Sequence, residues 1–230
     1  MANAELMLDG LLLVDKPLGI SSFDVIRRLR RQTGVRKIGH AGTLDPLATG
    51  LMLMLFGKAC KQAERLTKLD KRYEALITLG ANSSTGDAEG ELTTVSDLVP
   101  DRAAVLAALE QFTGEISQVP SAYSAIKIDG KEAYKRVRAG ETVTIPARRV
   151  TIYENELVDY TYPVISLRTK VSSGTYIRSL AQDVGAALGT GAYLSGLVRS
   201  EVGDYLLKDA VNLADADAGT VAARLIGLAA

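Results

Sequence analysis

Residues 39–50 restrict the fold of this chain more than any other stretch, because their backbone path is unusual. The sequence there is Gly-His-Ala-Gly-Thr-Leu-Asp-Pro-Leu-Ala-Thr-Gly, with three glycines and one proline in twelve positions. Glycine reaches positive φ at little steric cost, whereas Pro46 fixes its own φ and moves Asp45 away from the helical region. The six apolar residues 51–56 are too few to cross a membrane and predict a buried strand or short core element. We therefore expect Asp45 to be a carboxylate on a stiff loop at the edge of the core.

Two interpretations of this loop follow from its residues alone. Asp-Pro is common in turns, where the aspartate side chain accepts backbone N–H groups and takes no part in chemistry. Alternatively, the loop holds Asp45 as a catalytic carboxylate, although a single acid in a loop is weak support for a reaction. The choice depends on whether other parts of the chain carry matching features.

Composition excludes several kinds of protein and site. With 230 residues, 47% of them hydrophobic, the chain can bury the core of one large domain or two small ones. Cys60 is the only cysteine and His40 the only histidine, so an internal disulfide, a cysteine zinc site and a histidine-rich metal site are excluded. We therefore expect no cofactor, and no metal unless carboxylates bind Mg²⁺. Residues 1–13 lack the basic segment of a signal peptide, so we expect a cytoplasmic protein with no membrane anchor.

Charge is unevenly distributed along the chain, although the net charge is zero. Residues 16–72 hold 13 Lys or Arg and 4 Asp or Glu, and residues 118–150 hold 7 and 3, whereas residues 73–117 hold 1 and 8. The two basic blocks can neutralise the phosphates of a nucleic acid if the fold gathers them on one face. For the arginines at 27, 28, 30 and 31, an ordinary solvated helix face is a fair alternative.

Hydrophobic periodicity predicts helices and strands that suit an α+β fold. The predicted strands are residues 11–14, 72–80, 118–130 with an Asp-Gly turn, 148–158 and 163–172. The predicted helices start at Ser21 or Ser22, at residue 59, at Asp101, at Lys131 and after the turn at 172–175. The second of these is expected to end at 69, the third near 114 and the fourth at 139, and residues 81–100 are expected to be mostly loop.

Arg178 stands in the first turn of the last of these helices, an unusual place for a cation. The helix dipole places partial positive charge there, so a nearby cation is unfavourable by up to about 1 kcal/mol. Arg178 should therefore have an anionic partner or a functional reason to be there.

Five ordered motifs resemble those of the tRNA pseudouridine synthase B family, from about residue 11 to about residue 205. They are Lys16-Pro17-Leu18-Gly19 with Ser21-Ser22, residues 39–50, Tyr73 on its strand, Ser124-Ala125-Ile126-Lys127 with the later Gly130 and Tyr134, and Gly174-Thr175-Tyr176-Ile177-Arg178. Two departures are Ser21 in place of the usual Thr, and Ser173 where the family usually has a basic or polar residue. So many matches in the same order are far more specific than any single motif.

The resemblance implies the pseudouridine synthase fold. In that α+β fold, a mixed and mostly antiparallel central sheet is flanked by helices and loops, and the active site lies in a cleft. Residues 1–205 would form the catalytic domain and residues 206–230 a C-terminal extension. Bacterial members usually continue into a small RNA-binding (PUA-like) domain, which we expect to be absent from this chain or truncated.

The implied reaction isomerises the uridine at position 55 in the T loop of tRNA to pseudouridine. The N1–C1′ bond breaks, the base rotates and is rejoined through C5, so no redox cofactor is required. The resemblance assigns the catalysis to Asp45, to Arg178 as its partner, and to Tyr73, which stacks on the uracil. Asp45, ionised at neutral pH, acts as nucleophile at the sugar or the base, or removes a ribose proton, and the sequence does not separate these roles.

The same resemblance, together with the basic blocks, predicts a set of substrate contacts. The target base must be flipped out of the RNA, which costs a few kcal/mol that binding has to offset. The predicted contacts are Lys16, His40, Tyr176, Leu197, Lys127, Lys131, Tyr134 and Arg138. We therefore expect a monomer whose partner is the T-arm stem-loop of tRNA, with no membrane and no metal.

Two other functions fit parts of the sequence. An RNA-binding or tRNA-folding protein of the same fold would keep the cleft with little or no catalysis, but should have lost at least one of Asp45, Tyr73 and Arg178. A small-molecule hydrolase or lyase that uses Asp45 would leave the two basic blocks without a purpose.

Overall fold

The computed structural model describes residues 8–121, 127–128, 130–133, 136 and 139–228. The chain divides into two compact units, unit 1 (Met1–Tyr73 and Val198–Ala230) and unit 2 (Glu74–Leu197). Each is described by itself. Strands β4 (Lys71–Leu79) and β12 (Ala192–Val202) contribute residues to both units.

Unit 1 is built on the buried strand β3 (Ala48–Phe56), as the apolar run predicted. Strand β1 (Gly10–Lys16) pairs with it antiparallel, from Gly10 opposite Phe56 to Lys16 opposite Gly50. Within this unit the strand order is β14-β1-β3-β12, and β2 (Ile38–Ala41) also pairs with β3. The two remaining short strands of unit 1 are β13 (Tyr205–Leu206) and β14 (Val211–Asn212).

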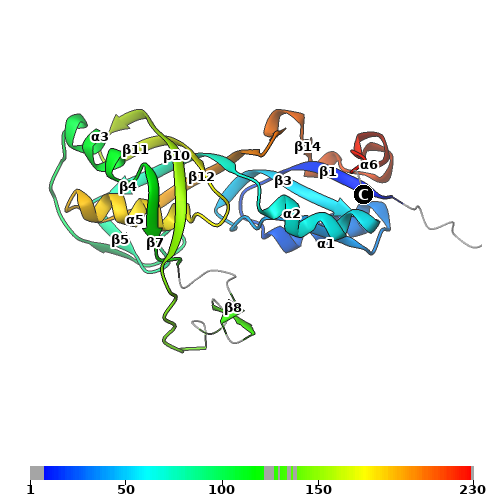
Figure 1. Ribbon diagram of the computed structural model, residues 1–230, viewed down its shortest axis with the longest axis horizontal. Helices are drawn as coiled ribbons and strands as arrows, with labels where there is room; N and C mark the ends of the chain where they lie inside the picture. The colour runs from blue at the N-terminus through cyan, green and yellow to red at the C-terminus, as the bar shows by residue number, and fades with distance from the viewer. Residues whose placement is uncertain (1–7, 122–126, 129, 134–135, 137–138, 229–230) are drawn as a thin grey trace, which may run out of the picture. The chain divides into compact units, whose positions relative to one another are not determined.

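Helix α1 (Ser22–Thr33) begins with a reciprocal cap. The Ser21 hydroxyl accepts from the Asp24 N–H at 3.2 Å, and the Asp24 carboxylate accepts from the Ser21 N–H at 2.9 Å. Ser21 is thus the cap, and Ser22 is released for another role. Both α1 and α2 (Ala63–Thr67) contact β2 (Figure 1).

Residues 206–228, which we expected to be an extension, are part of unit 1. Strand β14 pairs parallel with β1, and Leu11 and Ile226 exchange backbone hydrogen bonds of 2.9 and 2.8 Å. The helical elements here are η2 (Leu207–Asp209), η3 (Leu213–Asp215) and α6 (Ala218–Arg224).

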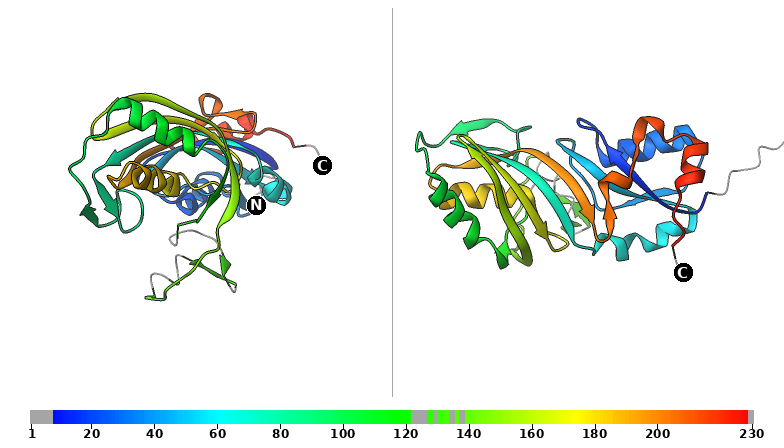
Figure 2. Two further views of the ribbon diagram at one scale, coloured as in Figure 1. Left: turned by 60° about the vertical axis from the view of Figure 1, so that its left-hand side comes forward. Right: turned by 90° about the horizontal axis from the view of Figure 1, so that it is seen from above.

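Within unit 2 the strand order is β12-β4-β11-β10-β7. The long antiparallel hairpin of β10 (Arg148–Thr161) and β11 (Val164–Val171) confirms the strand pair predicted there (Figure 2). Strand β7 (Gly114–Gln118) lies on the other side of β10, and α3 (Arg102–Gln111) contacts both β10 and α5 (Ile177–Ala187). A mixed, mostly antiparallel sheet with flanking helices is the predicted architecture.

Four expectations about local structure were wrong in part. The strand predicted at 118–130 is interrupted, because β7 ends at Gln118 and Pro120 has no N–H to donate, and the next described strand is Lys127–Ile128. The helix predicted at 59–69 is a 3-10 turn, η1 (Gly57–Gln62), followed by the short α2, and the Asp9 carboxylate accepts from the Ala59 N–H in the first turn of η1 at 3.0 Å. Within 81–100, β5 (Ala81–Ser83) and β6 (Leu92–Thr94) form a hairpin. Lys131 lies in β9 (Lys131–Glu132), paired with β8 (Lys127–Ile128), and not in a helix, because the turn at Gly130 reverses the chain into a second strand.

Within the described residues, no helix is long and apolar enough to cross a membrane.

Candidate active site

Asp45 lies half-buried in the loop between β2 and β3. Its carbonyl accepts from the Ala48 N–H at 3.1 Å, and Pro46 takes the second position of this turn, where its fixed φ is favourable. The Gly19 N–H donates to the Pro46 carbonyl at 2.9 Å, which ties the loop to the turn after β1. The predicted fixed loop is therefore confirmed.

Ser22 fixes the residue that precedes Asp45. Its buried hydroxyl donates to the Leu44 carbonyl at 2.9 Å and accepts from the Leu44 N–H at 2.8 Å. Both backbone polar groups of Leu44 are thus satisfied by one side chain on α1. From the sequence, Ser22 was expected as a possible helix cap and as part of the first family motif, so this contact with Leu44 was missed.

Arg199 on β12 holds the same loop from inside unit 1. Its side chain is 1% exposed and donates to three carbonyls, those of Leu51 at 2.8 Å, Gly42 at 3.1 Å and Thr43 at 3.4 Å. A Cβ on Gly50 would lie 2.5 Å from the Arg199 carbonyl oxygen, and one on Gly42 3.3 Å from Nη1. Both glycines also have positive φ, +98° and +91°. The glycines of this loop therefore allow the backbone to close around a buried guanidinium.

The charge of Arg199 acts on two neighbours in unit 1. Burial, and then the nearby Arg199, lower the pKa of His40 below its ordinary 6.5, so its imidazole is neutral at pH 7. The buried Nδ1 of His40 has no hydrogen-bond partner among the described residues. Burial and Arg199 also lower the pKa of Lys71 to about 8. A contact between His40 and RNA, which stays a prediction, would rest on hydrogen bonding or stacking and not on charge.

Lys16 lies inside its turn and not at the surface. Its side chain is fully buried, and Nζ donates to the carbonyls of Ile20 at 2.6 Å and Pro17 at 3.0 Å. An ammonium in this position stabilises the turn that contacts Pro46. The direct RNA contact predicted for Lys16 therefore has no support from its position. Tyr73, also in unit 1, is buried at 8% exposure, and its stacking role stays a prediction.

Arg178 in unit 2 has the anionic partner that its helix position required. Nη1 of Arg178 lies 3.3 Å from Oδ2 of Asp87 and donates to the Thr85 carbonyl at 3.2 Å. The side chains of Arg178 and Asp87 are 7% and 3% exposed. Oδ1 of Asp87 in turn accepts from the Thr85 hydroxyl at 2.6 Å and the Glu89 N–H at 3.1 Å. Asp87 was missed because it lies in the stretch 81–100, which was expected to be mostly loop. The pairing of Arg178 with Asp45 stays a prediction.

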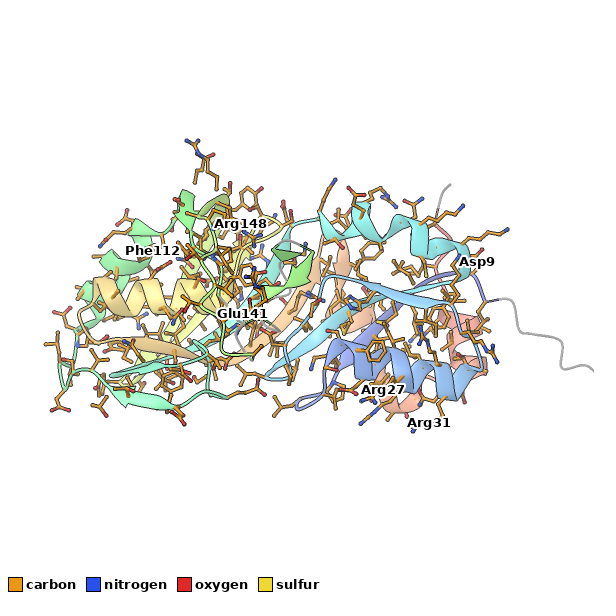
Figure 3. All side chains as sticks on the ribbon, turned by 90° about the horizontal axis from the view of Figure 1, so that it is seen from below. Asp9, Arg27, Arg31, Phe112, Glu141 and Arg148 are labelled. Carbon is orange, nitrogen blue, oxygen red and sulfur yellow. The ribbon has the colours of Figure 1, made fainter. Side chains whose placement is uncertain are left out.

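Tyr176 precedes α5 and is held on two sides. The amide of the buried Gln118 accepts from the Tyr176 N–H at 2.8 Å and donates to its carbonyl at 3.0 Å. The guanidinium of Arg148, labelled in Figure 3, lies 4.8 Å from the centre of the Tyr176 ring and donates to the Gly174 carbonyl. The Gly-Thr-Tyr-Ile-Arg motif is thus a rigid entry to the helix.

The other predicted contacts are in unit 2. Leu197 is half-buried on β12, while Lys127 and Lys131 belong to the hairpin of β8 and β9. Tyr134 and Arg138 lie outside the described residues. A pocket of about 360 Å³ lies beside Thr85 and α5, where burial raises the pKa of the lining residue Asp183. Among the described residues, no three His, Cys, Asp or Glu side chains gather where they could hold a metal.

Comparison with known proteins gives consistent matches over most of the chain. The family model described as TruB family pseudouridylate synthase (N terminal domain) matches residues 30–177. The tRNA pseudouridine synthase B of Cupriavidus taiwanensis is 53% identical over 212 residues, which make up 91% of this chain and 67% of that protein. That of Burkholderia pseudomallei is 50% identical over 213 residues, 93% of this chain and 70% of that protein.

One solved structure, a Cbf5-Nop10-Gar1 complex, contains a chain with a TM-score of 0.70 and 28% identity to this one. The match covers 91% of this chain and 54% of the other. The present chain thus spans about half the length of that solved chain.

Proposed function

Because the chain belongs to the TruB family of pseudouridylate synthases, we propose that it isomerises the uridine at position 55 in the T loop of tRNA to pseudouridine. Family membership also confirms the predicted pseudouridine synthase fold. The observation that supports the activity most is the fixation of the Asp45 loop by Ser22, Gly19 and Arg199. A carboxylate accelerates a reaction most when its position is fixed before the substrate binds.

Asp45 is the proposed catalytic residue. Isomerisation breaks N1–C1′ of the target uridine, turns the uracil and forms C1′–C5, and the proton displaced from C5 is exchanged for one on N1. Nothing is oxidised or reduced, so the reaction needs no redox cofactor. Attack on C1′, attack on the uracil ring and removal of a ribose proton remain alternative first steps for Asp45.

Arg178 is proposed to hold Asp45 in its charged form. A guanidinium has five N–H donors in a planar fork, so contact with Asp87 and Thr85 through Nη1 is compatible with a contact to a second carboxylate. In this arrangement Asp87 orients Arg178, and Arg178 orients Asp45. Tyr73 is proposed to stack on the flipped uracil.

The substrate side of the proposal rests on RNA chemistry. Tyr176 and Leu197 would contact the flipped base, and His40, Lys127, Lys131, Tyr134 and Arg138 would contact the surrounding RNA. Unpaired bases stack on aromatic rings while basic groups neutralise their phosphates. We propose that the protein acts as a monomer on the T arm, in the cytoplasm, where its tRNA substrate would be found.

The proposal is tested by tritium release from a T-arm stem-loop labelled at C5 of the target uridine. We expect release by the wild type and none by Asp45→Asn, a nearly isosteric variant that should still bind the RNA. A wild type that binds tightly without releasing tritium would sink the enzyme hypothesis and favour a tRNA-folding protein of the same fold.

A further inference from the structure

The outer face of α1 combines an exposed aromatic ring with a row of arginines. Phe23, Arg27, Arg30 and Arg31 are spaced i, i+4, i+7 and i+8, which places them on one side of the helix, and all four are exposed. Figure 3 shows Arg27 and Arg31 projecting from α1 at the edge of the molecule. The opposite side, with Val25, Ile26 and Leu29, is buried, so the direction of the exposed face is fixed.

Phe23 has no evident structural task. Its side chain is 57% exposed, and Leu18, in the preceding turn, is 65% exposed. The start of the helix is already capped by Ser21 and Asp24, and the core side is filled by other residues. An exposed phenyl ring is useful where it can cover another flat apolar surface, such as the face of an unpaired base.

Arg27 is already placed over this ring. Its guanidinium lies 5.9 Å from the centre of Phe23 and pairs with the Asp24 carboxylate. Asp24 is the only acid of α1, against four arginines, so the helix surface remains strongly positive. Ring and cation together match the two features of a single-stranded nucleic acid, a planar base and a charged phosphate.

The start of α1, where Phe23 lies, is next to the loop that carries Asp45. Ser22, the neighbour of Phe23, hydrogen-bonds both backbone groups of Leu44, and Leu44 precedes Asp45 directly. An RNA whose target base reaches Asp45 must bring the nucleotides beside that base close to the start of α1. Extrusion of the target breaks its stacking on those nucleotides, and they then need a new surface.

We infer that the outer face of α1 is an RNA-binding surface, on which Phe23 stacks with an unpaired base next to the target and Arg27, Arg30 and Arg31 contact phosphates. The inference rests on the proposed function, because it takes RNA as the substrate. Arg30 and Arg31 also suit the helix dipole in the last turn of α1, but the dipole explains neither Phe23 nor Arg27.

The phosphate part is tested by the salt dependence of T-arm stem-loop binding. For Arg27→Gln/Arg31→Gln we expect the slope of log Kd against log salt concentration to fall by about 1–2 relative to the wild type. The control Lys208→Gln/Arg224→Gln removes two exposed cations of unit 1 outside α1 and should leave the slope unchanged. Equal slopes for the wild type and both double variants would overturn the phosphate contacts. If thermal melting shows that Arg27→Gln/Arg31→Gln is unfolded, the single variant Arg31→Gln is used for the same test. Its slope of log Kd against log salt concentration should fall by about 1 relative to the wild type.

The stacking part is tested at Phe23. Phe23→Ala should weaken binding of the stem-loop by about 5- to 100-fold with an unchanged salt slope, and Phe23→Trp should restore it. Binding of a fully paired duplex should not change. Equal affinity of wild type and Phe23→Ala for the stem-loop overturns the stacking role.

Tritium release separates this inference from the proposed function. When RNA is limiting, the α1 variants should release tritium more slowly than the wild type, in proportion to their weaker binding. A wild type that binds RNA through α1 but shows no turnover contradicts the proposed activity alone. An active wild type whose α1 variants bind normally contradicts the α1 surface alone.

Discussion

Units 1 and 2 each fix a segment of the proposed active site around a buried arginine, but with different partners. Arg199 in unit 1 donates to the carbonyls of Gly42, Thr43 and Leu51, whereas Arg178 in unit 2 meets the carboxylate of Asp87. In unit 2, the charges of Arg178 and Asp87 cancel each other. The carbonyls of unit 1 are neutral, so the charge of Arg199 still acts on His40 and Lys71. The difference shows that one arginine holds a backbone shape, while the other holds a side chain.

The largest effect is expected from breaking the pair in unit 2. Arg178→Met leaves the Asp87 carboxylate buried without its cation, which should lower the free energy of unfolding by about 3–5 kcal/mol. Turnover should fall by about 100-fold or more, because Arg178 is proposed to stabilise the reacting carboxylate. Urea unfolding and tritium release measure the two effects.

A matched double variant distinguishes the two consequences. Arg178→Met/Asp87→Leu removes both charges, so stability should largely return while turnover stays low. Recovery of turnover in the double variant would contradict a role of Arg178 beyond its pairing with Asp87.

A smaller effect is expected in unit 1, where the partners left behind are neutral. Arg199→Met should cost about 2–4 kcal/mol of stability through three lost hydrogen bonds from a charged donor. Turnover should fall by about 10- to 100-fold as the Asp45 loop loses its position, with a smaller change in RNA affinity. Arg199→Lys keeps the charge but loses the planar fork, and should lie between wild type and Arg199→Met.

His40 gives a direct readout of the charge at Arg199. It is the only histidine, so its ring protons are a single resolved signal in an NMR titration. In Arg199→Met its pKa should rise toward 6.5, and in Arg199→Lys it should stay low. An unchanged pKa in Arg199→Met would show that burial alone sets it.

The pH dependence of stability sharpens the comparison further. The pKa of Lys71 falls from an ordinary 10.5 to about 8. Between these values the unfolded chain binds a proton that the folded chain lacks, so the free energy of unfolding should rise from about pH 8 to 10.5, by on the order of 2 kcal/mol. Lys71→Met should remove this rise, and Arg199→Met should reduce it. Stability that falls over this range in the wild type would contradict the direction of the shift.

The smallest effect is expected from the two serines at the start of α1. Ser21→Ala removes the helix cap and should cost about 1 kcal/mol, whereas Ser22→Ala leaves the buried backbone groups of Leu44 unpaired and should cost about 1–3 kcal/mol. Only Ser22→Ala should also lower turnover, by less than about 10-fold, because it alone contacts the Asp45 loop. Equal turnover in both variants would mean that Arg199 and Gly19 suffice to fix the loop.

The sequence predicted those features of the site that depend on local chemistry. The stiff loop of Asp45 followed from its glycines and proline, and the need of Arg178 for an anion followed from its place in a helix. The identity of that anion could not be predicted, because Asp87 reaches Arg178 only through the packing of unit 2. The contact of Arg199 with the Asp45 loop could not be predicted either, because a single arginine on a partly exposed strand belongs to no periodic pattern.

Sequence patterns do not show where a backbone group will be the partner of a side chain. Lys16 was predicted to contact RNA, which stays a prediction, and its buried ammonium donates to two carbonyls of its own turn. Lys131 was expected in a helix from its basic neighbours, whereas the Gly130 turn directs it into a strand. Side-chain patterns do not reveal such backbone partners.

The composition of unit 1 from two separate segments bears on how the protein is made. Unit 2 is one continuous stretch, so all of its residues are translated before the second segment of unit 1 is synthesised. Arg199 belongs to that second segment, and the Asp45 loop is already translated well before it. During translation, the Asp45 loop therefore lacks its contact with Arg199 until the first segment of unit 1 and the whole of unit 2 have been synthesised. A nascent chain that stops before Arg199 still has the contacts of Ser22 and Gly19 to the Asp45 loop, but lacks the buried guanidinium around which that loop closes.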